Sequence, residues 1–169
     1  MNSSINPLTQ QLAQILMAKG LKIALAESCT GGLLAAHLTS LAGSSNWFER
    51  GFVTYSNQAK EESIGVSNEL IEQYGAVSEE VAKAMAEGAL NHSLAQVSVA
   101  ITGIAGPGGG SANKPVGMVC FAWRMRADDR IQTRSQTKYF SGDRESIREQ
   151  ACVYAIELLL EQLTTSASR

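Results

Sequence analysis

A short apolar run that leads through a glycine-containing turn into a helix constrains the fold of this chain most. Residues 22–26 are typical of a buried strand, and residues 33–38 are typical of a helix. The turn between them, Glu27-Ser28-Cys29-Thr30-Gly31-Gly32, carries hydroxyls, a thiol and two glycines. Backbone N–H groups at the start of a helix can bind an anion. The segment therefore predicts a small polar pocket that is suited to small-molecule chemistry.

The rest of the chain alternates between strand patterns and helix patterns. Ser78 and Asp143 are typical of residues that cap the start of a helix. A charged turn at 126–130 separates two strand patterns and predicts a hairpin, so we expect a mixed sheet. Strands interleaved with helices indicate a layered α/β domain. We expect strands at 22–26, 51–55, 96–102, 116–123 and 133–140. We expect helices through 8–16 (ended by Gly20) and at 31–41, 60–64, 68–74, 78–91 and 143–163.

The composition excludes several functional classes. With 169 residues, 44% of them hydrophobic and 18% charged, the chain has the length and balance of one globular domain. A net charge of −2 argues against nucleic acid as a partner. No run of eighteen apolar residues predicts a membrane span, and the first residues lack signal-peptide features, so we expect a cytoplasmic protein. The three cysteines are widely spaced and predict neither a disulfide framework nor a metal-binding pair.

Three polar clusters lie at predicted strand ends or turns. The first is 27–30, the second is Ser44-Ser45 with Tyr55 and Lys60 downstream, and the third is the glycine-rich stretch 102–110. Ligands of open α/β sheets bind outside the strand ends. We therefore expect these clusters to converge on one site.

Lysine is the general base that the sequence favours. The chain has two histidines, His37 and His92, and both lie in helical patterns, so neither a Ser-His-Asp triad nor a histidine-ligated metal site is expected. Lys60 follows Tyr55 by five residues and can act as a base if burial disfavours its charged form. The alternative interpretation of Lys60 is an exposed helix lysine.

Two other patterns resemble nucleophile sites. Cys29 lies at a predicted helix start, where a thiolate is stabilised, and it is a rival nucleophile; the alternative is a buried structural cysteine. Ser135 and Lys138 match the Ser-x-x-Lys pattern of acyl enzymes. They lie in a strand pattern, where residues three apart point to opposite faces, so we interpret the match as accidental.

Two further features are suited to holding a ligand. The glycine-rich stretch 102–110 lacks the Gly-Lys-Ser/Thr of a phosphate-binding loop, and we interpret it as a wall where backbone amides approach a ligand closely. Arg144 begins the last helix and can bind a phosphate or carboxylate, although a surface arginine fits the pattern equally well.

Taken together, several long motifs resemble the C-terminal domain of the CinA (competence/damage-inducible) family. They are AESCTGG at 26–32, GSSNWFERGFVTYSNQAK at 43–60, IGV at 64–66, GAVSEEVA at 75–82, TGIAGPGGG at 102–110 and KPVG at 114–117. The resemblance covers nearly the whole chain, from about residue 7 to residue 163, and it predicts one domain over 1–169. The molybdopterin-binding type of domain that accompanies some members is missing from this sequence.

The resemblance implies a fold, an activity and a set of site residues. The fold is a three-layer α/β/α domain with a mixed, mostly parallel sheet, in a homo-oligomer. The activity is deamidation of nicotinamide mononucleotide to nicotinate mononucleotide and ammonia, with no metal and no organic cofactor. The catalytic positions are Ser45 as nucleophile and Lys60 as base, assisted by Tyr55 and Thr102, with Ser28 as the alternative nucleophile. Ser28, Thr30 and Arg144 line the pocket.

A mechanism follows as a hypothesis. Neutral Lys60 takes the proton of Ser45 as its Oγ attacks the carboxamide, and Tyr55 relays that proton to the departing ammonia. Backbone amides near Ser45 or at the Thr102-Gly103 turn stabilise the oxyanion. The 5′-phosphate of the substrate binds at a helix start such as Gly31, or to Arg144. The rival hypotheses are a pyridine-nucleotide-binding or protein-interaction module without catalysis, and an amidase that uses Cys29.

Overall fold

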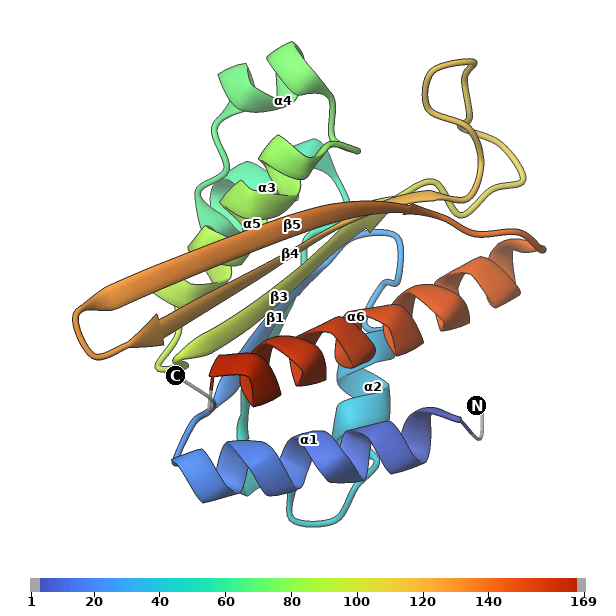
Figure 1. Ribbon diagram of the computed structural model, residues 1–169. Coiled ribbons are helices and arrows are strands. Elements are labelled where there is room, and N and C mark those ends of the chain that lie inside the picture. The colour runs from blue at the N-terminus through green and yellow to red at the C-terminus, as the bar shows by residue number, and fades with distance from the viewer. Residues whose placement is uncertain (1–3, 167–169) are drawn as a thin grey trace.

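A five-stranded sheet with helices on both faces forms the core of the computed structural model, which describes residues 4–166 (Figure 1). The strand order is β2-β1-β3-β4-β5. The strands are β1 (Ile23–Glu27), β2 (Phe48–Val53), β3 (Val97–Gly103), β4 (Met118–Ala127) and β5 (Arg130–Tyr139). The helices are α1 (Ile5–Lys19), α2 (Leu33–Thr39), the short 3-10 helix η1 (Ser44–Asn46), α3 (Asn57–Ile64), α4 (Asn68–Tyr74), α5 (Glu79–Asn91) and α6 (Arg144–Ser166).

Strand directions in the sheet are mixed, as expected from the hairpin. Strand β1 pairs in parallel with both β2 and β3. Strands β3 and β4, and β4 and β5, pair antiparallel. Two of the four pairings are thus parallel, fewer than "mostly parallel" implies, because the pairing of β3 with β4 is antiparallel as well as the pairing within the hairpin.

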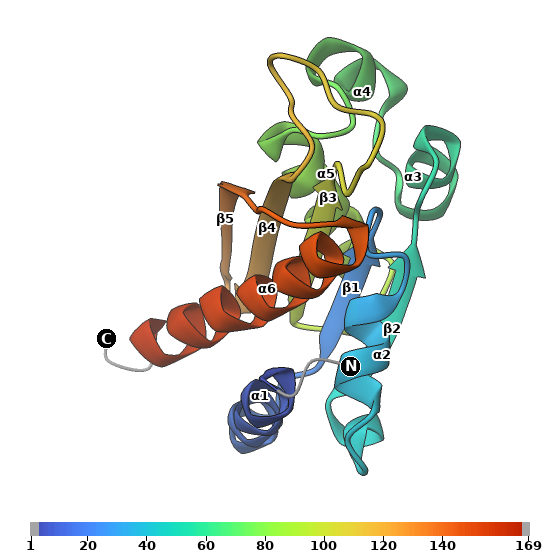
Figure 2. The same cartoon turned by 90° about the vertical axis from the view of Figure 1, so that its right-hand side faces the viewer.

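The alternation of side chains along β1 divides the interior into two apolar layers. Ile23 and Leu25 belong to a large core with residues of α1, α2 and α6, whereas Ala26 belongs to a second core with residues of α3, α4 and α5. Figure 2 shows α2 and α6 on one side of the sheet and α3, α4 and α5 on the other. The three-layer α/β/α architecture is therefore confirmed.

The element bounds differ from the predicted ones mainly at the sheet edges. Strand β2 begins at Phe48, three residues before the predicted start, because its pairing with β1 begins there. The hairpin strands extend to Ala127 and Arg130, so the turn shrinks to two residues, with Asp128 at φ 54°. The charged residues of 126–130 therefore lie at the end of the hairpin, which extends beyond α5 (Figure 1). Within residues 4–166, every helix is too short or too polar to cross a membrane.

Candidate active site

Ser28 lies directly after β1, at the carboxyl edge of the parallel strands. Its backbone N–H donates to Ile101 O at 2.9 Å, which continues the β1–β3 ladder by one rung. Its side chain is 8% exposed. The sheet therefore fixes the backbone of Ser28 while its hydroxyl stays accessible from the edge.

Lys60 reaches Ser28 from α3. Ser56 caps this helix by accepting a hydrogen bond from Ala59 N, so the helix starts at Asn57, three residues before Lys60. The side chain of Lys60 is 1% exposed, which excludes the interpretation as an exposed lysine. Its Nζ lies 3.0 Å from Ser28 Oγ and donates to Thr54 O at 2.9 Å and to Tyr55 O at 3.2 Å.

The surroundings of Lys60 make its proton easier to remove. Burial lowers the pKa of Lys60, because the charged form loses its hydration. Among the described residues, Lys60 forms no ion pair that would restore the charge. Lys60 Nζ donates to Ser28 Oγ as well as to the two carbonyls, and the Ser28 hydroxyl donates to Tyr55 O at 3.4 Å. Once the amine has lost its proton, its lone pair lies within reach of the Ser28 hydroxyl. The arrangement can therefore deprotonate Ser28.

Ser28 and Lys60 open into a cavity of about 260 Å3 at the carboxyl edge of the sheet. Six of the predicted site residues line it together: Ser28, Tyr55, Lys60, Thr102, Gly103 and Arg144. Thr102 donates its hydroxyl proton to Ala76 O at 2.9 Å and so holds the loop before α5 against β3. The first and third polar clusters, with Tyr55 and Lys60, therefore converge as expected.

Gly103 is required where β3 passes β4 at the cavity wall. A Cβ on this residue would lie 2.8 Å from Val119 Cγ2 and 2.9 Å from Met118 O. Both distances are shorter than normal contacts, so a side chain would push the two strands apart. Glycine lets the backbone of β3 line the cavity directly.

Arg144 and Tyr55 form the rim of the cavity. The guanidinium of Arg144 donates from Nη1 to Gly106 O at 2.8 Å and from Nη2 to Tyr55 Oη at 3.0 Å. These bonds connect the first turn of α6 to the glycine-rich loop and to the loop after β2. The hydroxyl of Tyr55 is thus at the rim, whereas its backbone carbonyl contacts the base, so Tyr55 Oη is not placed to relay a proton from Lys60.

Ser45 is not brought to this site. It lies exposed in η1, before the start of β2, whereas Tyr55 and Lys60 follow the end of β2. The length of this six-residue strand, about 20 Å, separates the two ends. The pairing of Ser45 with Lys60 is therefore replaced by the pairing of Ser28 with Lys60.

The start of α2 is already occupied by an anion from the chain itself. The buried carboxylate of Glu27 accepts hydrogen bonds from Leu34 N at 2.9 Å and Ala35 N at 3.0 Å. Neither Thr30 nor Gly31 lines the cavity. The expectation that this helix start holds the phosphate of a substrate is therefore wrong, because Glu27 takes the donors.

Three other candidate residues, one cysteine and two histidines, are unsuited to catalysis. Cys29 lines the cavity, but burial raises the pKa of its thiol to about 12, so it is protonated at neutral pH. His37 is buried, with Nε2 2.9 Å from Glu149 Oε2. His92 contacts Gly88 O through Nδ1 at 2.7 Å. Both histidines are absent from the residues that line the cavity.

The Ser-x-x-Lys match on β5 is accidental, as predicted. Ser135 donates its hydroxyl proton to Glu79 Oε1 of α5 at 2.7 Å. Lys138 lies over the ring of Tyr154 of α6, 5.1 Å from its centre. The two side chains therefore point to opposite faces of the sheet.

Comparison with known proteins gives the family. The model of the CinA C-terminal domain matches residues 5–163. The chain belongs to this family. It is 51% identical over 158 residues to a protein of Enterobacter agglomerans named nicotinamide-nucleotide amidohydrolase PncC, with 94% of each chain covered. It is 50% identical over 161 residues to the protein of the same name in Escherichia coli strain K12, with 95% of this chain and 96% of that one covered.

Solved structures agree with the fold of this CinA domain. The crystal structure of the competence/damage inducible protein CihA from Agrobacterium tumefaciens superposes with a TM-score of 0.89 at 43% identity. The match covers 97% of this chain and 98% of that one. The α/β fold deduced from the sequence is therefore that of the family.

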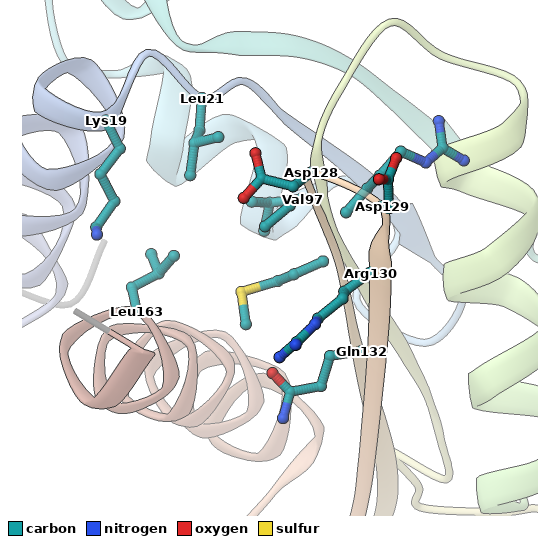
Figure 3. Close-up of a pocket in the computed structure, with 11 residues that line it drawn as sticks. Lys19, Leu21, Val97, Asp128, Asp129, Arg130, Gln132 and Leu163 are labelled. Carbon is teal, nitrogen blue, oxygen red and sulfur yellow. The ribbon is translucent and has the colours of Figure 1, made fainter. Parts of the chain in front are cut away.

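A larger cavity of about 560 Å3 lies at the opposite end of the sheet of this CinA domain (Figure 3). Lys19, Asp128 and Arg130 line it, together with apolar residues such as Leu21 and Leu163. None of the predicted site residues lies there. Across residues 4–166, no group of three His, Cys, Asp or Glu side chains is arranged to hold a metal ion.

Sequence reasoning missed two charged residues beside the site. Glu27 belongs to the first polar cluster and was given no role, although negative charge near the start of a helix is stabilising. Arg148 lies four residues after Arg144, so the two share one face of α6, and this spacing is the signal that could have revealed it.

Proposed function

We propose that this CinA-family chain hydrolyses the carboxamide of nicotinamide mononucleotide, with Ser28 as nucleophile and Lys60 as base. The substrate class is supported by the relatives named nicotinamide-nucleotide amidohydrolase, which are about half identical over nearly the full length. The observation that carries the residue assignment is the 3.0 Å distance between Lys60 Nζ and Ser28 Oγ in a cavity at the strand ends.

Acylation begins with proton transfer inside this pair. The amine of Lys60 takes the proton of Ser28 as Oγ attacks the carboxamide carbon, which the electron-poor pyridinium ring activates. The tetrahedral intermediate then collapses, and the ammonium of Lys60 returns the proton to the departing nitrogen. Ammonia leaves, and the nicotinyl group stays on Ser28 as an ester.

Backbone donors at the strand ends stabilise the oxyanion. Ile101 O accepts from Ser28 N, and hydrogen-bonding groups alternate along a strand, so the N–H of Gly103 is directed to the same side of β3 as Ile101 O. The N–H of Cys29 follows the nucleophile directly. One donor of this kind contributes about 3 kcal/mol to transition-state stabilisation.

Substrate orientation comes from the two ends of the cavity. The pyridine ring lies between the glycine-rich loop and the wall formed by Ala76 and Val77. The 5′-phosphate binds at the rim to Arg144, whose Nη1 and Nη2 donate to Gly106 O and Tyr55 Oη and each keep one further N–H for a phosphate oxygen. Holding both ends keeps the carboxamide carbon next to Ser28 Oγ.

Deacylation uses the same base. Water donates a proton to Lys60 as it attacks the ester, and that proton then returns to Ser28 Oγ when nicotinate mononucleotide leaves. No metal or organic cofactor takes part in these steps. The expected homo-oligomeric state and cytoplasmic location stay predictions, which sedimentation and cell fractionation can test.

Ammonia release from nicotinamide mononucleotide tests the proposal. Ser28→Ala should lower turnover by about 10³-fold or more, since Ser28 acts in both chemical steps. Ser45→Ala is the matched control, because it removes the same hydroxyl at the other end of β2 and should leave turnover within about twofold. Normal turnover in Ser28→Ala would reject the nucleophile. A parent chain that binds the nucleotide without releasing ammonia would favour the binding-module alternative.

A further inference from the structure

Arg148 is a charged side chain at the turn that follows Ser28, and the mechanism above does not use it. It lies in the second turn of α6, whose first turns approach the end of β1 (Figure 2). Its Nε donates to Cys29 O at 3.1 Å, and its Nη2 donates to Thr30 O at 2.9 Å. We propose that Arg148 is a positioning residue that holds the turn carrying Ser28 in its reactive geometry. This inference rests on the proposed role of Ser28.

The bond from Arg148 to Thr30 O is linked to Ser28 through one peptide plane. The C=O and N–H groups of a trans peptide point in opposite directions. Fixing Thr30 O therefore also fixes the direction of the N–H of Gly31. That N–H donates to Ser28 O at 3.0 Å and closes the turn behind the nucleophile.

The turn needs such support because its following residues are glycines in the left-handed region. Gly31 has φ 58° and Gly32 has φ 98°. Glycine loses more backbone entropy on ordering than any other residue, so ordering this segment costs more free energy than ordering one without glycine. The sheet fixes the residues before Ser28, and Arg148 fixes the residues after it.

An arginine suits this position better than a lysine. Two successive carbonyls are bound by two N–H groups of one planar guanidinium, a geometry that a single ammonium cannot reproduce. The guanidinium also packs against the turn, with Nη2 3.6 Å from the place where a Cβ of Gly31 would lie. The adjacent carboxylate of Glu149 is bound to His37, so it does not compete for Arg148.

Arg148→Ala and Arg148→Lys test the inference, with Gln150→Ala as the matched control. Gln150 also donates from α6 to a backbone carbonyl, Ser141 O at 2.8 Å, but outside the turn. A misplaced nucleophile costs turnover, so kcat for ammonia release should fall about 10–100-fold in Arg148→Ala while KM changes less than about threefold. Arg148→Lys should recover only part of kcat, and Gln150→Ala should keep it.

Chemical rescue distinguishes positioning from general destabilisation. Millimolar methylguanidinium should restore part of the turnover of Arg148→Ala and none of Ser28→Ala. Full kcat in Arg148→Ala, an effect on KM alone, or full kcat in Arg148→Lys would overturn the inference, and the lysine variant decides if the alanine variant does not fold. If Ser28→Ala is inactive while Arg148→Ala is unaffected, only this inference fails; if Ser28→Ala is active, the proposed function fails.

Discussion

Lys60 Nζ lies 3.0 Å from Ser28 Oγ, although the two residues are 32 positions apart and come from different layers of the fold. Ser28 extends β1 of the sheet, whereas Lys60 belongs to α3, which packs with α5 on one face. The pair is therefore created by the docking of α3 and not by local sequence. This origin determines which substitutions should affect turnover.

The pH dependence of turnover should report the neutral form of Lys60. Because burial lowers the pKa of Lys60, kcat/KM should rise with pH as the amine loses its proton, with a midpoint below the ordinary lysine value of 10.5. Measuring kcat/KM across the pH range checks this. Lys60→Ala should lose about 10³-fold or more in turnover, and adding Ser28→Ala should cost little further, because the two groups act together. A pH-independent rate in the parent would contradict the assignment.

Cys29→Ala should remain active. The thiol has its pKa raised to about 12 by burial and is 6% exposed, so it supplies little thiolate at neutral pH. We expect kcat within about threefold of the parent and no loss of activity on brief treatment with iodoacetamide. Ammonia release before and after alkylation measures both. Inactivation by either change would restore the cysteine-amidase alternative.

Arg144→Ala should weaken the binding of the phosphorylated substrate. Hydrogen bonds to charged groups contribute about 1.5–3 kcal/mol, so KM for nicotinamide mononucleotide should rise about 10–100-fold with a smaller change in kcat. Nicotinamide riboside lacks the phosphate and provides the matched substrate, for which the variant and the parent should differ little. A fall in kcat alone would remove Arg144 from the phosphate site.

Gly103→Ala and Gly108→Ala form a matched pair in the cavity wall. A Cβ at Gly103 would collide with Val119 and Met118, whereas nothing lies within 4 Å of a Cβ at Gly108. Gly103→Ala should lower the free energy of unfolding by about 1–3 kcal/mol, as overpacking does elsewhere. Gly108→Ala should change it by less than about 0.5 kcal/mol. Urea denaturation followed by circular dichroism measures both, and equal stabilities would contradict the packing argument.

The sequence predicted the elements and the convergence of polar segments, because both depend on local patterns. Apolar periodicity and turn residues define the strands, and parallel strands bring the residues that follow them to one edge. The same rule could have separated the two serines. Ser28 follows a strand, whereas Ser45 precedes one and is brought to the opposite edge.

The contacts around the pair depended on packing that no local pattern contains. The burial of Lys60 comes from the docking of α3, and the bonds of Arg148 connect segments more than a hundred residues apart. Glu27 competes with a substrate anion for the start of α2 because of its side-chain direction. Each of these contacts became visible only once the helices were placed on the sheet.

Helix α3, which carries Lys60, packs in an apolar cluster that includes its own Ile64 and Met85 of α5. Shortening either side chain would change how α3 packs. It would therefore shift Lys60 Nζ relative to Ser28 Oγ without removing a polar atom. Substitutions of one aliphatic residue for another in this cluster can therefore change the reaction rate during evolution. Relatives with identical polar residues at the strand ends should then differ in rate where the apolar residues that pack α3 differ.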